Sequence, residues 1–335
     1  MAKNVTIKDI AREAGVSIAL VSFVMNNRVE ADGKQKYRVS EATKERILEV
    51  ARRMNYKPSS AARMLRQGRT RVIGVVLSDL GNIFYGVIAK ELERIIYRRG
   101  YTIVFGSTEE DPERFGRLVQ SFMDKDVEGL IAVPPQGAEE YVTRMVKSGK
   151  PFVVIDRHHP DFQVPSVLTD NKEAMYRAVE TLKKQGAAKI DMVSYAMRIS
   201  SMTDREEAFC EKTGPEAKIF RLSFNNVEQE AEQVADEILR RGTDGVITAS
   251  NVPGVAIVKA LFRRGVHIQR DIKFVGFDFS NIYGFFEPAI PYMLQPLPEI
   301  AREAADYLFR LIEMQDQGMD ISTVNDKIIL KATLQ

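Results

Sequence analysis

The feature that most constrains the fold is an alternation, from Val72 onward, of short apolar runs with amphipathic helical segments. Such runs are typical of buried parallel strands. The pattern occurs twice, before and after Asp170. The runs are Val72–Leu77, Tyr101–Phe105, Gly129–Val133 and Phe152–Ile155, then Ile190–Ser194, Ile219–Leu222, Gly245–Thr248 and Lys273–Gly276. Two successive sets predict an α/β fold with two doubly wound lobes of parallel sheet. Ligands of such sheets bind at the carboxyl ends of the strands, here in a cleft between the lobes.

The start of the chain has a different charge from the rest. Residues 1–71 contain 16 Lys or Arg against 7 Asp or Glu, whereas the other 264 residues contain 32 against 39. A small basic head on an acidic body fits a local module that binds a polyanion, with a solvated charged surface as the alternative. The sequence shows neither a long apolar run nor a secretory start, and Cys210 is its only cysteine. We therefore expect a cytoplasmic chain without a membrane span or disulfide framework.

The basic head contains the spacing of a helix-turn-helix. Thr6 is placed to cap a first helix, Gly15 to end it in a left-handed turn, and Ser17 to cap a second helix. The small Ala11 allows close approach of the two helices, and Val21 fills the angle between them. A third helix is expected from Ser40 to Met54, completing a three-helix core. Together with the positive charge, this arrangement predicts binding to DNA.

The residues of this head resemble the lactose-repressor/galactose-repressor (LacI/GalR) family of transcriptional regulators. The resemblance begins with Thr6-Ile7-Lys8-Asp9-Ile10-Ala11-Arg12-Glu13-Ala14-Gly15-Val16-Ser17, includes Val21-Ser22 and Asn26, continues through Asn55-Tyr56-Lys57-Pro58 and Ala62-Arg63-Met64-Leu65, and covers nearly all of the remaining chain. It implies a regulator, in most cases a repressor, that binds double-stranded operator DNA with pseudo-palindromic symmetry as a homodimer.

In this family the second helix enters the major groove and reads base edges from positions that are Ile18, Ala19 and Phe23 here. The family usually has polar side chains at the first two and arginine at the third. This chain has apolar groups at all three, so we expect contacts with thymine methyl groups, or polar contacts from elsewhere, to carry more of the specificity. Further DNA contacts are expected from Thr6, Ser17, Ser22, Asn26, Arg28 and Tyr56.

Two segments leave alternatives open. The loop from Asn27 to Arg38 is longer than the family's usual connection, and it is either a clamp on backbone phosphates or a solvated insertion. The resemblance assigns residues 58–71 to a hinge helix that folds on DNA, with Leu65 wedged between base pairs in the minor groove. Ser59, Ala62 and Arg63 are expected to contact DNA in the same segment. The alternative is a simple basic linker.

The resemblance divides the chain into a helix-turn-helix domain of residues 1–57, the hinge helix and linker of 58–71, and an effector-binding domain of 72–335 similar to the type 1 periplasmic binding proteins. In this family the chain crosses between lobes three times, which we place near residues 168, 292 and 324. Lobe 1 then comprises about 72–167 and 292–323, and lobe 2 about 168–291 and 324–335.

Nine residues at expected strand ends and crossings are candidates for effector contact. Arg205 and Asp278 match the family's ligand-binding arginine and carboxylate, and Asn82-Ile83-Phe84-Tyr85 resembles a loop whose aromatic rings stack on ligands. The full set is Asn82, Phe84, Tyr85, Asp156, Arg157, Arg205, Asn251, Asp278 and Gln295. Each polar residue could instead cap a helix. Together they suit a polyhydroxylated ligand, and a sugar or sugar derivative is the expected effector.

Other functions have less support. The sequence lacks the Gly-x-Gly-x-x-Gly and Walker-type motifs of nucleotide enzymes and a nucleophile elbow, although a Ser-His-Asp triad cannot be judged from sequence. His158 and His159 are adjacent, a poor geometry for helical metal chelation. Cys210 is expected to be buried filler. We therefore predict no catalytic residues, metal or cofactor. The competing class is a solute-binding receptor of the same sensor fold, which would not need residues 1–71.

Overall fold

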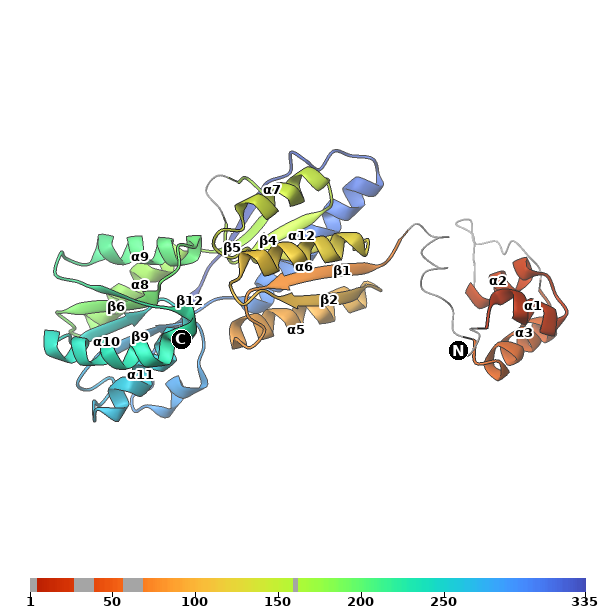
Figure 1. The fold of residues 1–335 in the computed structure, drawn as a ribbon. Helices are drawn as coiled ribbons and strands as arrows, with labels where there is room; N and C mark the ends of the chain where they lie inside the picture. Colours follow the sequence, from red (N-terminus) through yellow and green to blue (C-terminus); the bar gives the residue numbers. More distant parts are fainter. Residues whose placement is uncertain (1–4, 27–38, 57–68, 159–161) are drawn as a thin grey trace. The chain divides into compact units, whose positions relative to one another are not determined.

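The computed structural model describes residues 5–26, 39–56, 69–158 and 162–335. The chain forms two compact units, Met1–Thr70 and Arg71–Gln335, each of which is described by itself (Figure 1).

The first unit contains three described helices, α1 Ile7–Ala14, α2 Ile18–Asn26 and α3 Glu41–Arg53. A capping box begins α1: the Asp9 amide donates to the Thr6 hydroxyl at 3.4 Å, and the Thr6 amide donates to the Asp9 carboxylate at 3.0 Å. Gly15 ends α1 with φ 64°, a left-handed conformation that glycine adopts without steric cost. The predicted cap at Thr6 is thus confirmed, and Ser40 caps α3.

The three helices enclose a core of small and branched side chains. Ala11 and Val21 are both buried there, which confirms the helix-turn-helix packing predicted from their spacing. The core also contains Phe23, which the sequence placed on the DNA-reading face. Its buried members are Ile10, Ala11, Ala14, Val21, Phe23, Val24, Ile47, Val50 and Ala51.

The second unit contains two six-stranded sheets in its described part. The first comprises β1 Val72–Leu77, β2 Thr102–Ser107, β3 Gly129–Ala132, β4 Phe152–Ile155, β5 Ser166–Thr169 and β11 Lys327–Leu330. The second comprises β6 Ile190–Tyr195, β7 Ile219–Leu222, β8 Gly245–Thr248, β9 Lys273–Phe277, β10 Tyr292–Leu294 and β12 Thr333–Leu334. The orders are β11-β5-β4-β3-β1-β2 and β12-β10-β9-β8-β6-β7. In each sheet the strand that comes first in the sequence, β1 or β6, lies between the second strand, which forms the edge, and the third. The strand order therefore reverses at this point, where doubly wound folds bind their ligands.

Helices complete the two lobes. Lobe 1 has α5 Ile83–Arg98, α6 Pro112–Asp124, α7 Glu139–Ser148 and α12 Leu297–Asp316, and lobe 2 has α8 Asn171–Lys184, α9 Ser200–Lys212, α10 Val227–Arg241, α11 Asn251–Arg263 and the short helices η1 Phe224–Asn226 and η2 Asn281–Phe285. Figure 1 shows α12, in blue, among the yellow and orange elements of lobe 1. Its apolar face packs into the same core as α5, so lobe 1 is built from distant parts of the sequence.

The chain passes between the lobes after β5, after β10 and after β11. The first two crossings fall within a few residues of the positions expected near 168 and 292. The expectation of a third crossing near 324 is wrong, because Lys327–Leu330 pairs with β5 in the first sheet. Residues 324–330 therefore extend lobe 1, and only the last few residues of the chain belong to lobe 2.

The crossing segments are hydrogen-bonded to one another. The amide of Ala332 donates to the Asp170 carboxylate at 2.8 Å, and Arg177 donates to both Asp170 and the Ala332 carbonyl at 2.9 Å. Thr169 donates its hydroxyl hydrogen to the side-chain oxygen of Gln295, which joins the first crossing to the second.

Two further observations bear on the expectations. Among the helices of the described residues, none combines the length and the hydropathy that a membrane span requires. Cys210 lies in α9 as expected, but its side chain is exposed rather than buried.

Candidate ligand cleft and nucleic-acid interface

A cavity of about 40 Å³ is lined by residues of both lobes. All nine side chains that the sequence proposed for effector contact line it: Asn82, Phe84, Tyr85, Asp156, Arg157, Arg205, Asn251, Asp278 and Gln295. They come from strand ends, helix starts and a crossing that are far apart in the sequence. The topology therefore brings the candidate residues together at one place, as expected for the carboxyl edges of two facing sheets.

Two aspartates occupy equivalent places in the two lobes. Asp156 follows β4 directly and Asp278 follows β9, and each has φ 67°. This left-handed conformation is uncommon for residues other than glycine, and aspartate tolerates it better than most. Both side chains are buried. Each lobe thus presents one carboxylate to the cavity from a constrained backbone position.

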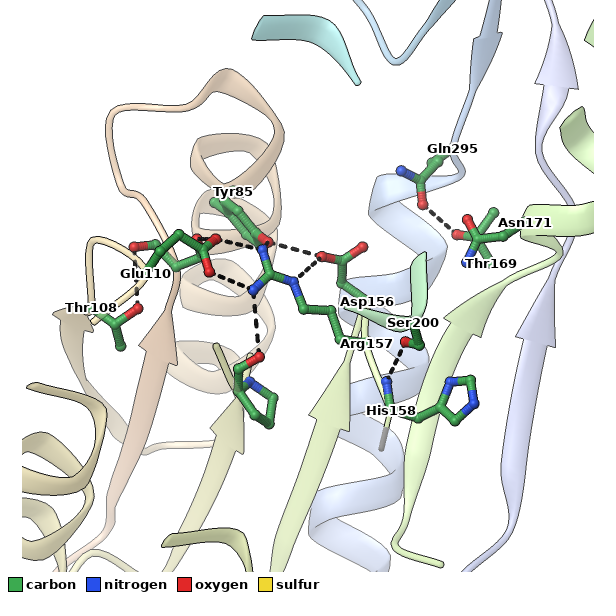
Figure 2. A network of polar contacts seen from close by, with 12 residues as sticks. Tyr85, Thr108, Glu110, Asp156, Arg157, His158, Thr169, Asn171, Ser200 and Gln295 are labelled. Atoms are coloured by element: carbon green, nitrogen blue, oxygen red, sulfur yellow. Dashed lines mark hydrogen bonds and ion pairs between the residues drawn. The ribbon is translucent and has the colours of Figure 1, made fainter. Parts of the chain in front are cut away.

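The lobe 1 side of the cavity is a closed polar network (Figure 2). The Tyr85 hydroxyl donates to Asp156 at 2.8 Å, and Arg157 donates to the same hydroxyl oxygen at 3.2 Å. The guanidinium of Arg157 also donates two hydrogen bonds to Glu110, at 2.6 and 2.8 Å. Sequence reasoning missed Glu110, although it lies just beyond β2, at the same sheet edge as Asp156.

Electrostatics keep these groups in defined states. Burial alone would raise the pKa of Glu110, but the charge and hydrogen bonds of Arg157 lower it below its usual value. Burial opposes the charge on Arg157, and the carboxylates of Glu110 and Asp156 nevertheless raise its pKa. Burial raises the pKa of Tyr85, so its hydroxyl remains a hydrogen-bond donor. In this network Arg157 is paired with two carboxylates, Glu110 and, at 3.5 Å from its Nε, Asp156, and the neutral Tyr85 hydroxyl contacts both Arg157 and Asp156.

The lobe 2 side is centred on Arg205, which is only 2% exposed. Its Nε donates to Asn171 at 2.9 Å, and its Nη1 donates to the Ala249 carbonyl at 2.7 Å. The guanidinium stacks 3.7 Å from the ring centre of Phe277. Its Nη2 is buried without a hydrogen-bond partner among the described residues. An unpaired buried donor beside a cavity is a natural contact for a ligand oxygen.

Asp278 lies near this arginine and is bound by Gln295, whose amide nitrogen donates to it at 2.7 Å. Burial raises the pKa of Asp278 to about 6, although Arg205 and Gln295 both oppose the increase. Gln295 in turn accepts from Thr169 at the first crossing. The carboxylate is therefore connected through one side chain to the segments that join the lobes.

This raised pKa gives a testable pH dependence. Because folded Asp278 binds its proton more tightly than an unfolded aspartate, stability should fall as pH rises from about 4 through 6, by about 3 kcal/mol in total. We expect Asp278→Asn to remove this component, as measured by thermal unfolding of the full chain between pH 4.5 and 7.5. An unchanged pH profile in the variant would show that Asp278 does not produce the dependence.

The two lobes are also bridged at the cavity by a pair of amides. The side-chain nitrogen of Asn251 donates to Asn82 at 2.9 Å, and the reverse hydrogen bond measures 3.4 Å. Asn82 also caps α5 by accepting from the Phe84 amide at 3.0 Å. Phe84 is buried and meets Tyr85 edge to face.

In the first unit, the start of α2 presents a small exposed surface. Ser17, Ile18 and Ala19 are exposed, and the Ser17 hydroxyl accepts from the Leu20 amide at 3.2 Å, which caps the helix. Phe23 is 8% exposed and packs in the core. Its large apolar side chain gains more from burial between the helices than from a position in water, so the expected base-reading role does not fit its placement.

The other expected DNA contacts divide into two groups. Thr6 is exposed as the cap of α1, Ser22 is half-buried, and Tyr56 packs partly against the core. Asn26 ends α2, but its side chain lies outside the described residues. The same holds for Arg28, the loop from residue 27 to 38, and the hinge residues Ser59, Ala62, Arg63 and Leu65.

Comparison with known protein families matches both units. Residues 6–59 match the family described as bacterial regulatory proteins, lacI family. Residues 73–313, more than half of the chain, match a periplasmic binding protein domain.

Individual proteins are similar over nearly the whole length. Catabolite control protein A of Priestia megaterium is 26% identical over 328 residues, covering 96% of each chain. The ribose operon repressor of Halalkalibacterium halodurans is 28% identical over 332 residues, covering 98% of this chain and 96% of the repressor. The fold is shared with the Lac repressor dimer bound to operator and the anti-inducer ONPF, at a TM-score of 0.82 and 20% identity, covering 99% of this chain and 98% of that one.

Proposed function

The chain belongs to the lacI family of bacterial regulatory proteins, and we propose that it represses transcription as a homodimer on a pseudo-palindromic operator, under control of a small hydroxylated metabolite. One observation carries this proposal: the nine predicted effector residues line one cavity between two lobes, in a chain that begins with a helix-turn-helix. A solute receptor would have no use for the basic first unit.

For the DNA-binding unit, we propose that α2 lies in the major groove with Ile18 and Ala19 towards the bases. Their apolar side chains suit the methyl group of thymine, the one apolar feature of a base edge in that groove. The positive charge of residues 1–71 supplies the phosphate contacts that fix the position on the duplex. Phe23 acts from the core by holding α2 in place.

For the dimer, we propose that a second copy covers an aromatic surface of lobe 2. Phe262 is 66% exposed and Phe285 is 84% exposed. With Ile282 and Phe286 they border a groove of about 450 Å³ between α11 and η2. A contiguous apolar surface of this kind typically marks an interface, and an operator with two half-sites requires a symmetric pair.

We expect Phe285→Asp combined with Phe262→Ser to give a monomer whose operator affinity falls at least tenfold, because the two half-sites then bind independently. Sedimentation of the full chain measures the oligomeric state, and fluorescence anisotropy measures operator binding. Ile329→Asp is the control, since Ile329 is 62% exposed on the edge strand β11 of lobe 1. A double variant that stays dimeric would place the interface elsewhere.

The whole proposal is tested by selecting DNA that the purified chain retains from a random library, followed by a screen of carbohydrates and related metabolites for release or enhancement of binding. We expect an inverted-repeat site rich in A·T pairs and at least one metabolite that changes its affinity by about 5–150-fold. Failure to enrich any inverted repeat, with or without metabolites, would contradict the proposal.

A further inference from the structure

Arg157 lies at the cleft but is already occupied by an internal partner. Figure 2 shows its guanidinium between Glu110 on one side and Asp156 on the other. Both ends of the fork donate to the Glu110 carboxylate, and the two side chains are only 7% and 9% exposed. This two-point contact is the geometry by which arginine binds the carboxylate or phosphate of a ligand.

The carboxylate comes from a constrained loop rather than from a rigid element. Glu110 lies between β2 and α6, and the consecutive residues Glu109 and Glu110 have φ 53° and 59°. Left-handed backbone at two successive residues other than glycine is costly, and such strain concentrates at ligand sites and switches. Release of Glu110 from Arg157 would allow this loop to relax. The strain energy released would offset part of the free energy lost with the ion pair.

The charges at the cavity limit what can replace Glu110. Arg157 and Arg205 are its buried cations, and Asp79, Glu110, Asp156 and Asp278 are its buried or half-buried anions among the described lining residues. A neutral ligand that displaced Glu110 would leave Arg157 buried with less compensating charge, which is unfavourable. A ligand that carries its own anionic group would preserve the balance.

We propose that Glu110 occupies the place of an effector's anionic group, and that the effector is a hydroxylated anion, a sugar acid or a sugar phosphate, whose charged group binds the Arg157 fork while its hydroxyls reach Arg205 and Asp278. This inference rests on the cleft being the effector site, as proposed above. It makes Arg157 a specificity-determining residue and Glu110 an internal competitor.

Space is consistent with this exchange. The cavity of about 40 Å³ holds no more than a few water molecules, so a sugar-sized ligand requires that something move. Glu110 is one of the side chains that fill the site. Arg157 and Ile199 also border a second cavity of about 380 Å³, which is lined by residues of both lobes. Room for the remainder of a ligand therefore adjoins the fork.

The test compares matched probes by calorimetry on the full chain: glycerol, glycerate and glycerol 3-phosphate, with D-glucitol and D-gluconate as the six-carbon pair. In the wild type we expect at least one anion to bind more tightly than its neutral counterpart. Glu110→Gln should raise anion affinity at least tenfold and leave the polyols unchanged. Arg157→Gln should remove the preference for the anions.

Glu109→Gln is the matched control, because it removes the same charge from the neighbouring residue of the same loop, and Glu109 is exposed and does not bind Arg157. Thermal unfolding establishes that each variant is folded. If the glutamine of Glu110→Gln still binds the Arg157 guanidinium, Glu110→Ala repeats the test without that contact. Comparison of glycerate with glycerol 3-phosphate assigns the anion as carboxylate or phosphate.

Equal affinities for anions and polyols in the wild type and in both Glu110 variants would overturn the proposal, as would an equal gain in Glu109→Gln. The outcome is separable from that of the proposed function. A chain released from operator by a neutral sugar alone keeps the function and refutes the anionic effector. A chain that binds these anions without any effect on operator binding keeps the anion site and refutes the proposed control of operator binding.

Discussion

Replacing Ile47 by alanine is expected to lower the free energy of unfolding of the helix-turn-helix unit by about 2–5 kcal/mol, the usual cost of emptying a fully buried branched side chain. Ile47 has no exposed surface and lies where α3 closes the core against α1 and α2. A unit of about 70 residues rarely holds more than about 3–5 kcal/mol in total. The single change should therefore leave a large fraction of this unit unfolded.

The consequence for DNA is expected to be equally large. Only the folded unit presents α2 to DNA. Each 1.4 kcal/mol by which the loss of stability exceeds the free energy of unfolding of this unit therefore lowers the apparent operator affinity about tenfold. Limited proteolysis should cut the first unit while residues 71–335 persist, and anisotropy should report the lost affinity. Glu45→Ala, exposed on the same helix, is the control. Resistance to proteolysis equal to the wild type would show that the three-helix core does not depend on Ile47.

The second large effect is expected at Arg205. Arg205→Met removes the charge and the donors while retaining most of the volume that packs on Phe277. We expect the affinity for the metabolite that acts on operator binding to fall at least about a hundredfold, since losing one partner of a buried charged contact costs about 3–5 kcal/mol. Operator affinity without metabolite should remain as in the wild type, because Arg205 lies in the other compact unit.

A second readout separates this role from simple destabilisation. Arg205 is one of the groups that hold down the pKa of Asp278, so its removal should move the pH dependence attributed to Asp278 above about 6. Arg221→Met is the matched control, because Arg221 lies on the same lobe in an exposed ion pair with Glu206. If the metabolite response survives Arg205→Met, the cleft is assigned to the wrong residues.

Much of the fold was predictable because buried parallel strands leave a strong local signal. The run Val72–Leu77 was expected with the bounds that β1 has, and so was Phe152–Ile155. The end of the chain was not predictable in this way. Lys327–Leu330 and Thr333–Leu334 are close in sequence and similar in character, yet they join different sheets. That division is decided by which edge strand each one meets, and the local sequence does not contain this information.

The candidate site shows the same limit. Asp156, Arg157 and Asp278 were identified because they follow recognisable strands, and Asp278 also matches a family pattern. Glu110 was missed because it does not directly follow β2 but lies in the short segment before α6, which Asp111 caps. Phe23 was assigned to the DNA-reading face by the family resemblance, and a helix of almost wholly apolar residues has no clear polar face that would have indicated its burial. In each case the missing information is a contact between residues distant in sequence.

The hydrogen bonds among the crossing segments have one further consequence. Asp170, Ala332 and Arg177 tie the first crossing to the third, and Thr169 with Gln295 ties the first to the second. The three connections therefore form a single pivot instead of three independent tethers, and opening of the lobes reduces to rotation about one axis. Gln295 also donates a hydrogen bond to Asp278. A ligand that contacts the Asp278 carboxylate therefore acts directly on the segments about which the lobes rotate.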